Sequence, residues 1–420
     1  MGGIRSVLGT LVSIATVSAA IAQQAEEKVT VRVWKPEMVE PTKARIDGLR
    51  APRGFKVAKF AEGLGHPRLM AVAPDGSVYV TRNFEGDVVR LKDADGDGRA
   101  EVQDSVLNLK DVHGICLHED KLYLTTIHEV HTVEIGEDGK LAEPKMVLDK
   151  MPDGGQHPRR TIAIGPDNRM YVSIGSTCNA CNETNPEHAS IIRAGLDGSG
   201  RAVYAQGLRN TLAFGWHPRT GTMYGVDQGT DDLGDKVPSE ELNVIEQGKH
   251  YGWPHVYDDG KINPAPPLLP GMTKEQLVAR NTSPVLGYTA HASPIAIVFA
   301  GDSLSPGAPA QDNEDAPRPW PEEYRDDAFV TFRGSWNAYP PAGYEIVRLK
   351  FRDGKPAEFE SFISGFIEGN GKECFARPAG LAWARDGSLL MSDDTNGVIY
   401  RIWYTGKNDG DDPLSGPDGP

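Results

Sequence analysis

The sequence predicts an all-β fold, a six-bladed β-propeller with long inserted loops, on three observations. A turn followed by an alternating strand recurs six times along the chain. The first three copies begin at residues 73, 118 and 165, so their spacings are 45 and 47 residues. This spacing is close to the ~40–45 residues of one four-stranded propeller blade. Helical periodicity is scarce, and 47 Gly and 31 Pro suit a chain with many tight turns.

Each copy reads as a hairpin in which a turn containing Asp or Gly lies between two short strands. The copies are "APDGSVYVTR" (73–82), "HEDKLYLTTI" (118–127), "GPDNRMYVSIG" (165–175), "HPRTGTMYGVD" (217–227), "RDDAFVTFRGS" (325–335) and "ARDGSLLMSDD" (384–394). Four are followed by a further strand, at 86–93, 129–136, 344–351 and 397–404. A β-sandwich is the competing all-β fold, but repeats of blade length favour the propeller.

The segment 231–324 is rich in Pro, Asp and Gly, and we expect long loops inserted on one face of the propeller. Its best helical stretch is short, at 273–281. The propeller domain is expected to span residues 51–405. An extended N-terminal arm is expected at 23–50 and a disordered tail at 406–420.

Residues 1–22 are typical of a signal peptide. Arg5 precedes an apolar stretch that ends in Ala20-Ile21-Ala22, a small-x-small pattern that predicts cleavage after Ala22. The apolar run is too short and too rich in Ser and Thr for a membrane span, although an uncleaved, lipid-associated N-terminus is the alternative. We therefore expect a periplasmic or secreted protein whose mature chain does not insert into a membrane.

The formal net charge of −15 argues against nucleic acid or an anionic membrane surface as a partner. Four cysteines permit one or two disulfides in an exported chain. Cys178 and Cys181 form a C-x-x-C motif without a second pair, which in a cytosolic protein would suggest a redox or zinc motif. Asn182 in place of His excludes haem attachment, and a disulfide that closes a tight loop is the favoured interpretation.

Two loops at equivalent positions carry candidate catalytic chemistry. His157 precedes the first strand of a blade, where a side chain can face the central channel, and imidazole is the usual general base near neutral pH. Arg209 and Asn210 occupy the same position one blade later and suit a planar ligand bearing carboxylates or quinone oxygens. The alternatives are a surface histidine, and an arginine paired with an acid on the rim.

Two stretches suggest calcium. "DQGTDDLGD" (227–235) places main-chain carbonyls beside carboxylates, the oxygen ligands that calcium prefers, and the following segment supplies Glu241 and Tyr251. Separately, acids between Asp93 and Asp104 have EF-hand-like spacing. Because that loop joins two predicted strands and Asp-Gly is a common hairpin turn, calcium and a plain turn both stay open there.

Several runs resemble the soluble pyrroloquinoline quinone (PQQ) sugar dehydrogenases, in the branch of sorbosone dehydrogenases and PQQ-dependent pyranose dehydrogenases. The likeness covers residues 54–405 and is most specific at 155–254, where G-x-R-N, Q-G-x-D and Y-G-W-P occur in order. It extends to "FRGSWNAYPPAGYEIVRLKF" (332–351) and to the C-terminal run at 377–404. The resemblance therefore implies a propeller dehydrogenase with PQQ and Ca²⁺.

The resemblance also implies residue roles. His157 is the base that removes the hydroxyl proton while hydride passes to a quinone carbon of PQQ, and Arg209 polarises that quinone. The remaining cofactor contacts are Asn210, which with Arg209 holds the carbonyl and carboxylate edge, then Arg333 and Arg377, with Arg68 and His113 at analogous inward loops. The calcium ligands are the main-chain carbonyls of Gly229 and Thr230, and for a second, structural calcium Glu241 and the carbonyl of Tyr251.

The function implied is oxidation of an aldose, pyranose or sugar aldehyde, with electrons passed to a separate periplasmic acceptor, a cytochrome or a quinone. Leu212 stands where glucose-oxidising relatives have an amide side chain, and Thr230 where they have proline, so the sugar is not identified. Two alternatives are a propeller that binds carbohydrate or protein without turnover, and a metal-dependent sugar lactonase. The lactonase fits less well because the loops that precede the blades offer His and Arg more than acids.

Overall fold

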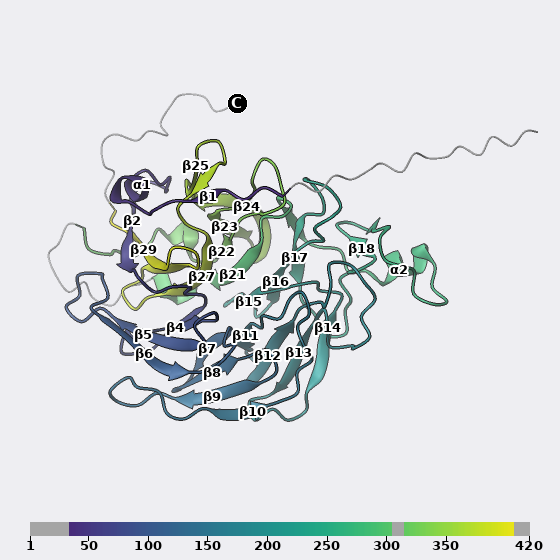
Figure 1. The fold of residues 1–420 in the computed structure, drawn as a ribbon, viewed down its shortest axis with the longest axis horizontal. Coiled ribbons are helices and arrows are strands. Elements are labelled where there is room, and N and C mark those ends of the chain that lie inside the picture. The colour runs from purple at the N-terminus through teal and green to yellow at the C-terminus, as the bar shows by residue number, and fades with distance from the viewer. Residues whose placement is uncertain (1–32, 305–314, 407–420) are drawn as a thin grey trace, which may run out of the picture.

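The structure, a computed structural model, describes residues 33–304 and 315–406 of the 420-residue chain. Within these residues the chain forms six four-stranded antiparallel sheets, two smaller sheets and two short α-helices (Figure 1). The prediction of an all-β fold is confirmed.

We number the six sheets along the chain and give their strands from the innermost to the outermost. Sheet 1 contains β3 (Met70–Val72), β4 (Val78–Arg82), β5 (Asp87–Lys92) and β6 (Val102–Asn108); sheet 2 contains β7 (Ile115–His118), β8 (Lys121–Thr125), β9 (Val130–Glu134) and β10 (Lys145–Leu148); sheet 3 contains β11 (Ile162–Ile164), β12 (Arg169–Ile174), β13 (Ser190–Gly195) and β14 (Ala202–Gln206). Sheet 4 contains β15 (Ala213–Trp216), β16 (Met223–Asp227), β17 (Glu240–Val244) and β20 (Leu286–Tyr288); sheet 5 contains β21 (Pro294–Phe299), β22 (Ala328–Phe332), β23 (Glu345–Arg352) and β24 (Lys355–Ile363); sheet 6 contains β27 (Pro378–Trp383), β28 (Leu389–Asp393), β29 (Val398–Tyr404) and β2 (Phe55–Ala61).

The sheets follow one another around a common centre. The innermost strand β3 lies against β7 and β27, β7 lies against β11, and β21 lies against both β15 and β27. Sheets 3 and 4 share an apolar cluster to which Tyr171, Phe214 and Met223 contribute. In Figure 1 the innermost strands accordingly lie toward the middle of the molecule, and β10 and β14 lie at its periphery. This is a propeller-type arrangement.

The second strands of three sheets, β16, β22 and β28, are buried at every position. Sheets that pack face to face cover both faces of an inner strand, so apolar and small side chains are needed on both. The sequence predicts alternating strands at these repeats, whereas in the structure these three strands are buried on both faces.

Sheet 6 joins the two ends of the described chain. Strand β2 pairs antiparallel with β29, with Phe55 opposite Tyr404. The Phe55 ring also packs against Trp320, Tyr324 and Phe362, at ring-centroid distances of 4.6 to 5.5 Å. A strand from the beginning of the fold thus completes a sheet made of its last three strands.

The predicted hairpins lie where the sequence places them, with one difference. In sheets 1 to 4 and in sheet 6 the repeat joins the first two strands by a tight turn. In sheet 5 the repeat at 325–335 supplies β22, whose partner β21 lies before a long connection at 300–327.

The expectation that 231–324 consists of inserted loops is wrong in part, because β17, β20 and β21 lie within it. The true insertion in sheet 4 lies between β17 and β20 and holds β18 (Val256–Tyr257), β19 (Lys261–Ile262) and α2 (Lys274–Arg280). Helix α2 falls on the predicted helical stretch and starts at Thr273 with a capping box. Strand β17 was missed because its sequence, EELNV, begins with two acids, and acids are depleted in strands.

The predicted arm is not extended throughout. Strand β1 (Glu37–Met38) pairs with β26 (Glu373–Cys374), which also pairs with β25 (Ile367–Glu368), and α1 (Lys43–Asp47) follows β1. The predicted signal peptide at 1–22 and all of the predicted tail except residue 406 lie outside the described residues. No helix within the described residues is long and apolar enough to cross a bilayer.

Candidate active site

Most predicted site residues precede the innermost strands. Arg68 lies before β3, His113 before β7, His157 before β11, Arg209 and Asn210 before β15, and Arg377 before β27. Arg333 directly follows β22. Sheets 1 to 5 run from their innermost strand outward, and in sheet 6 the innermost strand β27 comes first among the three C-terminal strands. The loops that precede the innermost strands therefore converge on the centre of one face.

A polar cavity of ≈240 Å³ lies among these loops. It is lined by Gln156, His157, Arg209, Gln228, Gly229, Asp231, Glu240, His291, Ser293, Trp336 and Asn337. The predicted base His157 and the predicted quinone contact Arg209 therefore face the same space.

The tautomer of His157 follows from its partner. Nδ1 lies 3.0 Å from the main-chain oxygen of Ser176, which can only accept, so Nδ1 carries the hydrogen and Nε2 has a free lone pair. Burial, helped by the charge of Arg209, lowers the pKa of His157 to about 3. A Cβ on Gly175 would lie only 2.5 Å from the Cβ of His157, so this close approach requires glycine. His157 is a neutral imidazole whose Nε2 has no hydrogen-bond partner among the described residues.

The direction of the Arg209 guanidinium is fixed by three hydrogen bonds. Nε donates to the main-chain oxygen of Asn179 (3.1 Å), and Nη2 donates to Asn179 Oδ1 (2.8 Å) and to Asp231 Oδ2 (2.6 Å). The main-chain nitrogens of Arg209 and Asn210 both donate to the buried carboxylate of Asp227, each at 2.8 Å. Asp227 therefore fixes the main chain of Arg209 and Asn210, the two predicted ligand-binding residues.

A second group of charges lies among these loops but outside the residues that line the cavity. Arg68 and Arg333 both form ion pairs with Asp394, and Arg333 Nε lies 2.9 Å from each carboxylate oxygen. The guanidiniums of Arg159 and Arg377 interact electrostatically with both Arg333 and Asp394. Arg159 has no hydrogen bond or ion pair with any described residue, although it lies 5.3 Å from the ring centroid of Phe84.

His113 differs from His157 in having both ring nitrogens occupied. Nδ1 donates to the main-chain oxygen of Arg160 (2.8 Å), and Nε2 accepts from Arg68 Nε (3.2 Å). Burial and the charge of Arg68 lower its pKa well below the usual value. His113 orients Arg68, and a direct cofactor contact for it stays a prediction.

The predicted calcium ligands Gly229, Thr230, Glu241 and Tyr251 line a second small cavity beside the first. The carbonyl oxygens of Gly229, Thr230 and Tyr251 accept no hydrogen bond from the described residues. Burial and the charge of Asp227 raise the pKa of Glu241 well above its usual value. Buried carboxylates and unpaired carbonyls suit a hard cation, so these residues fit calcium.

The acidic loop that begins at Asp93 joins β5 to β6, as predicted. Asp93, Asp95, Asp97 and Glu101 lie close enough together to share a metal ion, but each accepts main-chain N–H groups within the loop. Calcium binding by this loop stays a prediction.

Cys178 and Cys181 form the predicted disulfide, and within the described residues Cys116 and Cys374 are free thiols. The segment 176–181, which contains the disulfide loop, contacts both predicted residues: Ser176 contacts His157 and Asn179 contacts Arg209.

Sequence reasoning missed Asn179, Asp231, Arg159 and Asp394. Asp394 ends the sixth repeat, and Arg159 lies two residues after the candidate base, so position relative to the repeats could have identified both. Nothing in the sequence indicated that Asn179 contacts Arg209.

A propeller-type fold with a neutral, half-buried imidazole and a surplus of guanidiniums at its centre fits a quinone-dependent oxidoreductase. The chain belongs to the TrAA12-like family, a family of PQQ-dependent oxidoreductases, whose model matches residues 49–405. The family resemblance in the sequence is confirmed, and the protein is an oxidoreductase.

Similar proteins have matching descriptions. The chain is 24% identical to the pyrroloquinoline quinone-dependent sugar dehydrogenase of Hypocrea jecorina (strain QM6a), over 86% of this chain and 91% of the relative. A calcium structure of the Trichoderma reesei family AA12 enzyme superposes with a TM-score of 0.69 at 20% identity, over 85% of this chain and 97% of that one. The holo pyranose dehydrogenase PQQ domain from Coprinopsis cinerea gives a TM-score of 0.68 at 19% identity, over 84% and 97%.

Proposed function

We propose that the protein oxidises an aldose, pyranose or sugar aldehyde with PQQ and calcium, and passes the electrons to a separate acceptor, a cytochrome or a quinone. The observation that carries the proposal is the free Nε2 of His157 in the same cavity as the Arg209 guanidinium. The family and the names of the similar proteins support PQQ as cofactor and a sugar as substrate.

The donor set of the site fits PQQ, a planar tricarboxylate. Four guanidiniums, those of Arg68, Arg159, Arg333 and Arg377, face one carboxylate, Asp394, so the centre carries uncompensated positive charge. Arginine is well matched to carboxylates because its N–H groups form paired hydrogen bonds. These residues would hold the carboxylates, while Arg209 and Asn210 would hold another edge of the ring system.

When bound, PQQ supplies an electrophilic quinone that takes up two electrons from the sugar. His157 accepts the sugar hydroxyl proton at Nε2, because that nitrogen has a free lone pair and the low pKa keeps the ring neutral. The Nδ1–H bond to Ser176 holds the ring plane and stabilises the imidazolium as the proton arrives. Arg209 keeps a fixed positive charge on the same cavity, where negative charge develops on oxygen.

The carbonyls of Gly229 and Thr230 would bind a calcium ion at the edge of this cavity, and Glu241 and the Tyr251 carbonyl a second, structural one. A calcium ion held there would supply a Lewis acid, and its charge would add to that of Arg209. Gly229 lines both cavities, which supports a calcium site beside the proposed reaction centre.

We also propose that the six sheets are the six blades of one closed propeller within residues 51–405, with a removed signal peptide at 1–22 and a disordered tail at 406–420. The innermost-strand contacts and the β2–β29 pairing support ring closure. Export would place the enzyme in the periplasm or outside the cell.

The proposal is tested by adding PQQ and calcium to the purified chain and following dye-linked oxidation of a sugar panel. His157→Ala is expected to lower kcat by about 10²–10⁴-fold, with the PQQ Kd nearly unchanged. His66→Ala is the matched control, since it removes a half-exposed imidazole paired with Glu85 and is expected to leave kcat unchanged. Absence of bound quinone in the wild type would overturn the proposal, and sugar binding without oxidation would favour a binding propeller instead.

A further inference from the structure

We propose that Asn179, in the loop closed by the Cys178–Cys181 disulfide, is a positioning residue that sets Arg209 and the turn ending at Asp231 relative to His157. The effect on sugar oxidation rests on the proposed function, whereas the contacts themselves belong to this chain alone.

Asn179 binds three segments that are distant in sequence. Its main-chain oxygen accepts from Arg209 Nε (3.1 Å) and from Trp253 Nε1 (3.0 Å). Its Oδ1 accepts from Arg209 Nη2 (2.8 Å) and from the main-chain nitrogen of Asp231 (2.9 Å). One residue therefore ties the loop before β15, the turn after β16 and the insertion of sheet 4 together.

The two contacts to Arg209 fix the guanidinium as a plane. A single acceptor would leave the group free to rotate about that contact, whereas two acceptors on one residue define both its position and its plane. Without Oδ1, Asp231 becomes the remaining side-chain partner of Nη2, and the Asp231 main-chain nitrogen loses its acceptor at the same time. The guanidinium and the turn that carries Gly229 and Thr230 are thus loosened together.

The disulfide loop also reaches the base. Ser176 Oγ donates to the main-chain oxygen of Cys178 (2.7 Å), and the main-chain oxygen of Ser176 accepts from His157 Nδ1 (3.0 Å). The bond from Cys178 to Cys181 restricts the backbone of Asn179, which lies between them. The imidazole is consequently held by Ser176, two residues before the disulfide, and the guanidinium by Asn179 inside the loop that the disulfide closes.

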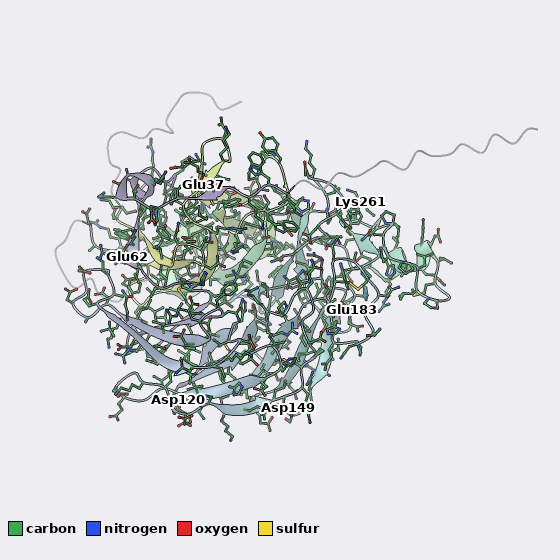
Figure 2. The ribbon with its side chains drawn as sticks, in the orientation of Figure 1. Glu37, Glu62, Asp120, Asp149, Glu183 and Lys261 are labelled. Carbon is green, nitrogen blue, oxygen red and sulfur yellow. A yellow bond between two sulfur atoms is a disulfide. The ribbon has the colours of Figure 1, made fainter. Side chains whose placement is uncertain are left out.

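Glu183 anchors the far end of the loop. Its carboxylate accepts from the main-chain nitrogen of Thr177 (2.6 Å) and from Thr177 Oγ1, and lies 3.2 Å from His188 Nδ1. In Figure 2 Glu183 and Lys261 lie on the side of the molecule where the sheet 4 insertion projects. The loop is therefore fixed on both sides of the disulfide.

The test uses the full chain without cofactor, labelled with ¹⁵N-arginine, so that its first readout does not depend on PQQ. The Arg209 Nε–Hε signal, assigned with Arg209→Lys, is compared in Asn179→Ala, Asn179→Asp, the Cys178→Ser/Cys181→Ser double variant and the control Asn182→Ala. Asn182 is next to the loop but its side chain donates to Pro267, away from Arg209.

The Ala and double-Ser variants are expected to shift the Arg209 signal and to raise its exchange with solvent about tenfold, because a hydrogen bond to a charged group is lost or loosened. PQQ affinity should fall by a similar factor. The Asp variant keeps an acceptor oxygen and should restore the signal, and Asn182→Ala should match the wild type.

Two results would overturn the positioning role. One is an unchanged Arg209 signal in Asn179→Ala; the other is a fall in Tm with unchanged signals in the folded double-Ser variant, which would mean that the disulfide only stabilises the fold. If the double-Ser variant does not fold, Asn179→Ala decides. If the signals change as expected but the wild type binds no PQQ, the positioning role stands and the proposed function fails.

Discussion

The two sides of the central site differ in how their charged and polar side chains are held. On the disulfide side, His157 and Arg209 are oriented by bonds to the loop that contains Ser176 and Asn179. On the arginine side, which we define as Arg68, Arg159, Arg333 and Arg377 around Asp394, several cations share one carboxylate. The disulfide side fixes the orientation of the His157 and Arg209 side chains, whereas the arginine side carries excess positive charge that suits an anionic ligand.

The largest effect that separates the two sides is expected for Asp394→Asn. Burial opposes ionisation of Asp394, but Arg333 and Arg68 outweigh it and lower the pKa to about 2, so the group is charged at all ordinary pH. Removing that charge leaves buried guanidiniums unpaired and should lower the free energy of unfolding by about 3–5 kcal/mol in urea. Added PQQ should restore much of this loss by replacing the missing negative charge.

Asp386→Asn is the control for that experiment. Asp386 pairs with Arg401 but is 40% exposed, so its loss should cost below ~1 kcal/mol. A cost for Asp394→Asn as small as that of the control would contradict the view that this carboxylate balances the arginine side.

Two adjacent arginines sharpen the comparison further. Arg159 has no hydrogen-bond or ion-pair partner among the described residues, so Arg159→Met should leave the unfolding free energy nearly unchanged while weakening PQQ binding about tenfold. Arg160 donates to the main-chain oxygens of Ile127, His157, Pro152 and Asp153, so Arg160→Met should reduce stability. Urea unfolding and PQQ titration by fluorescence distinguish the pair.

If Arg159→Met destabilised the chain as much as Arg160→Met, or bound PQQ like the wild type, the assignment of Arg159 to ligand binding would be wrong.

The last prediction concerns the pH response of His157. Burial and Arg209 lower its pKa to about 3 in the cofactor-free protein, whereas an unfolded chain has the ordinary value near 6.5. Because the unfolded state binds the proton first, this residue makes stability fall as pH decreases from about 6.5 to about 3. NMR of the imidazole should show a neutral ring with a protonated Nδ1 at pH 5.

His157→Gln should flatten part of that slope in urea titrations between pH 4 and 7. Protonation of His157 near pH 6 in the folded protein would show that the cavity is wetter than its geometry implies.

Much of the fold follows from local sequence, because each repeat carries its own turn and strand signals. Strand β17 could not be found this way, since Glu240 and Glu241 are buried acids whose carboxylates accept main-chain N–H groups from other segments, including Ser293, 53 residues from Glu240. Strand β20 was also missed within the expected loops at 231–324, because it is only three residues long and carries little pattern.

The site could be predicted only where it repeats. His157 and Arg209 occupy matching positions in successive sheets, so one indicated the other. Asn179 could not be predicted, since its role depends on Asp231, a partner 52 residues away. Asp394 could have been identified as a candidate from its place at the end of the sixth repeat, but its pairing with Arg68, 326 residues away, could not be predicted. The pKa of His157 also differs from the expected near-neutral value because burial, which the sequence does not reveal, dominates it.

The pairing of β2 with β29 sets the order in which the site can assemble. Arg377 precedes β27 and Asp394 follows β28, so both belong to the sheet that waits for the last strand of the fold. As the chain folds, His157 and its loop can be in place while Arg377 and Asp394 of the arginine side are still missing. On the proposed closed propeller, we expect the chain to bind its cofactor only after β29 has formed and paired with β2.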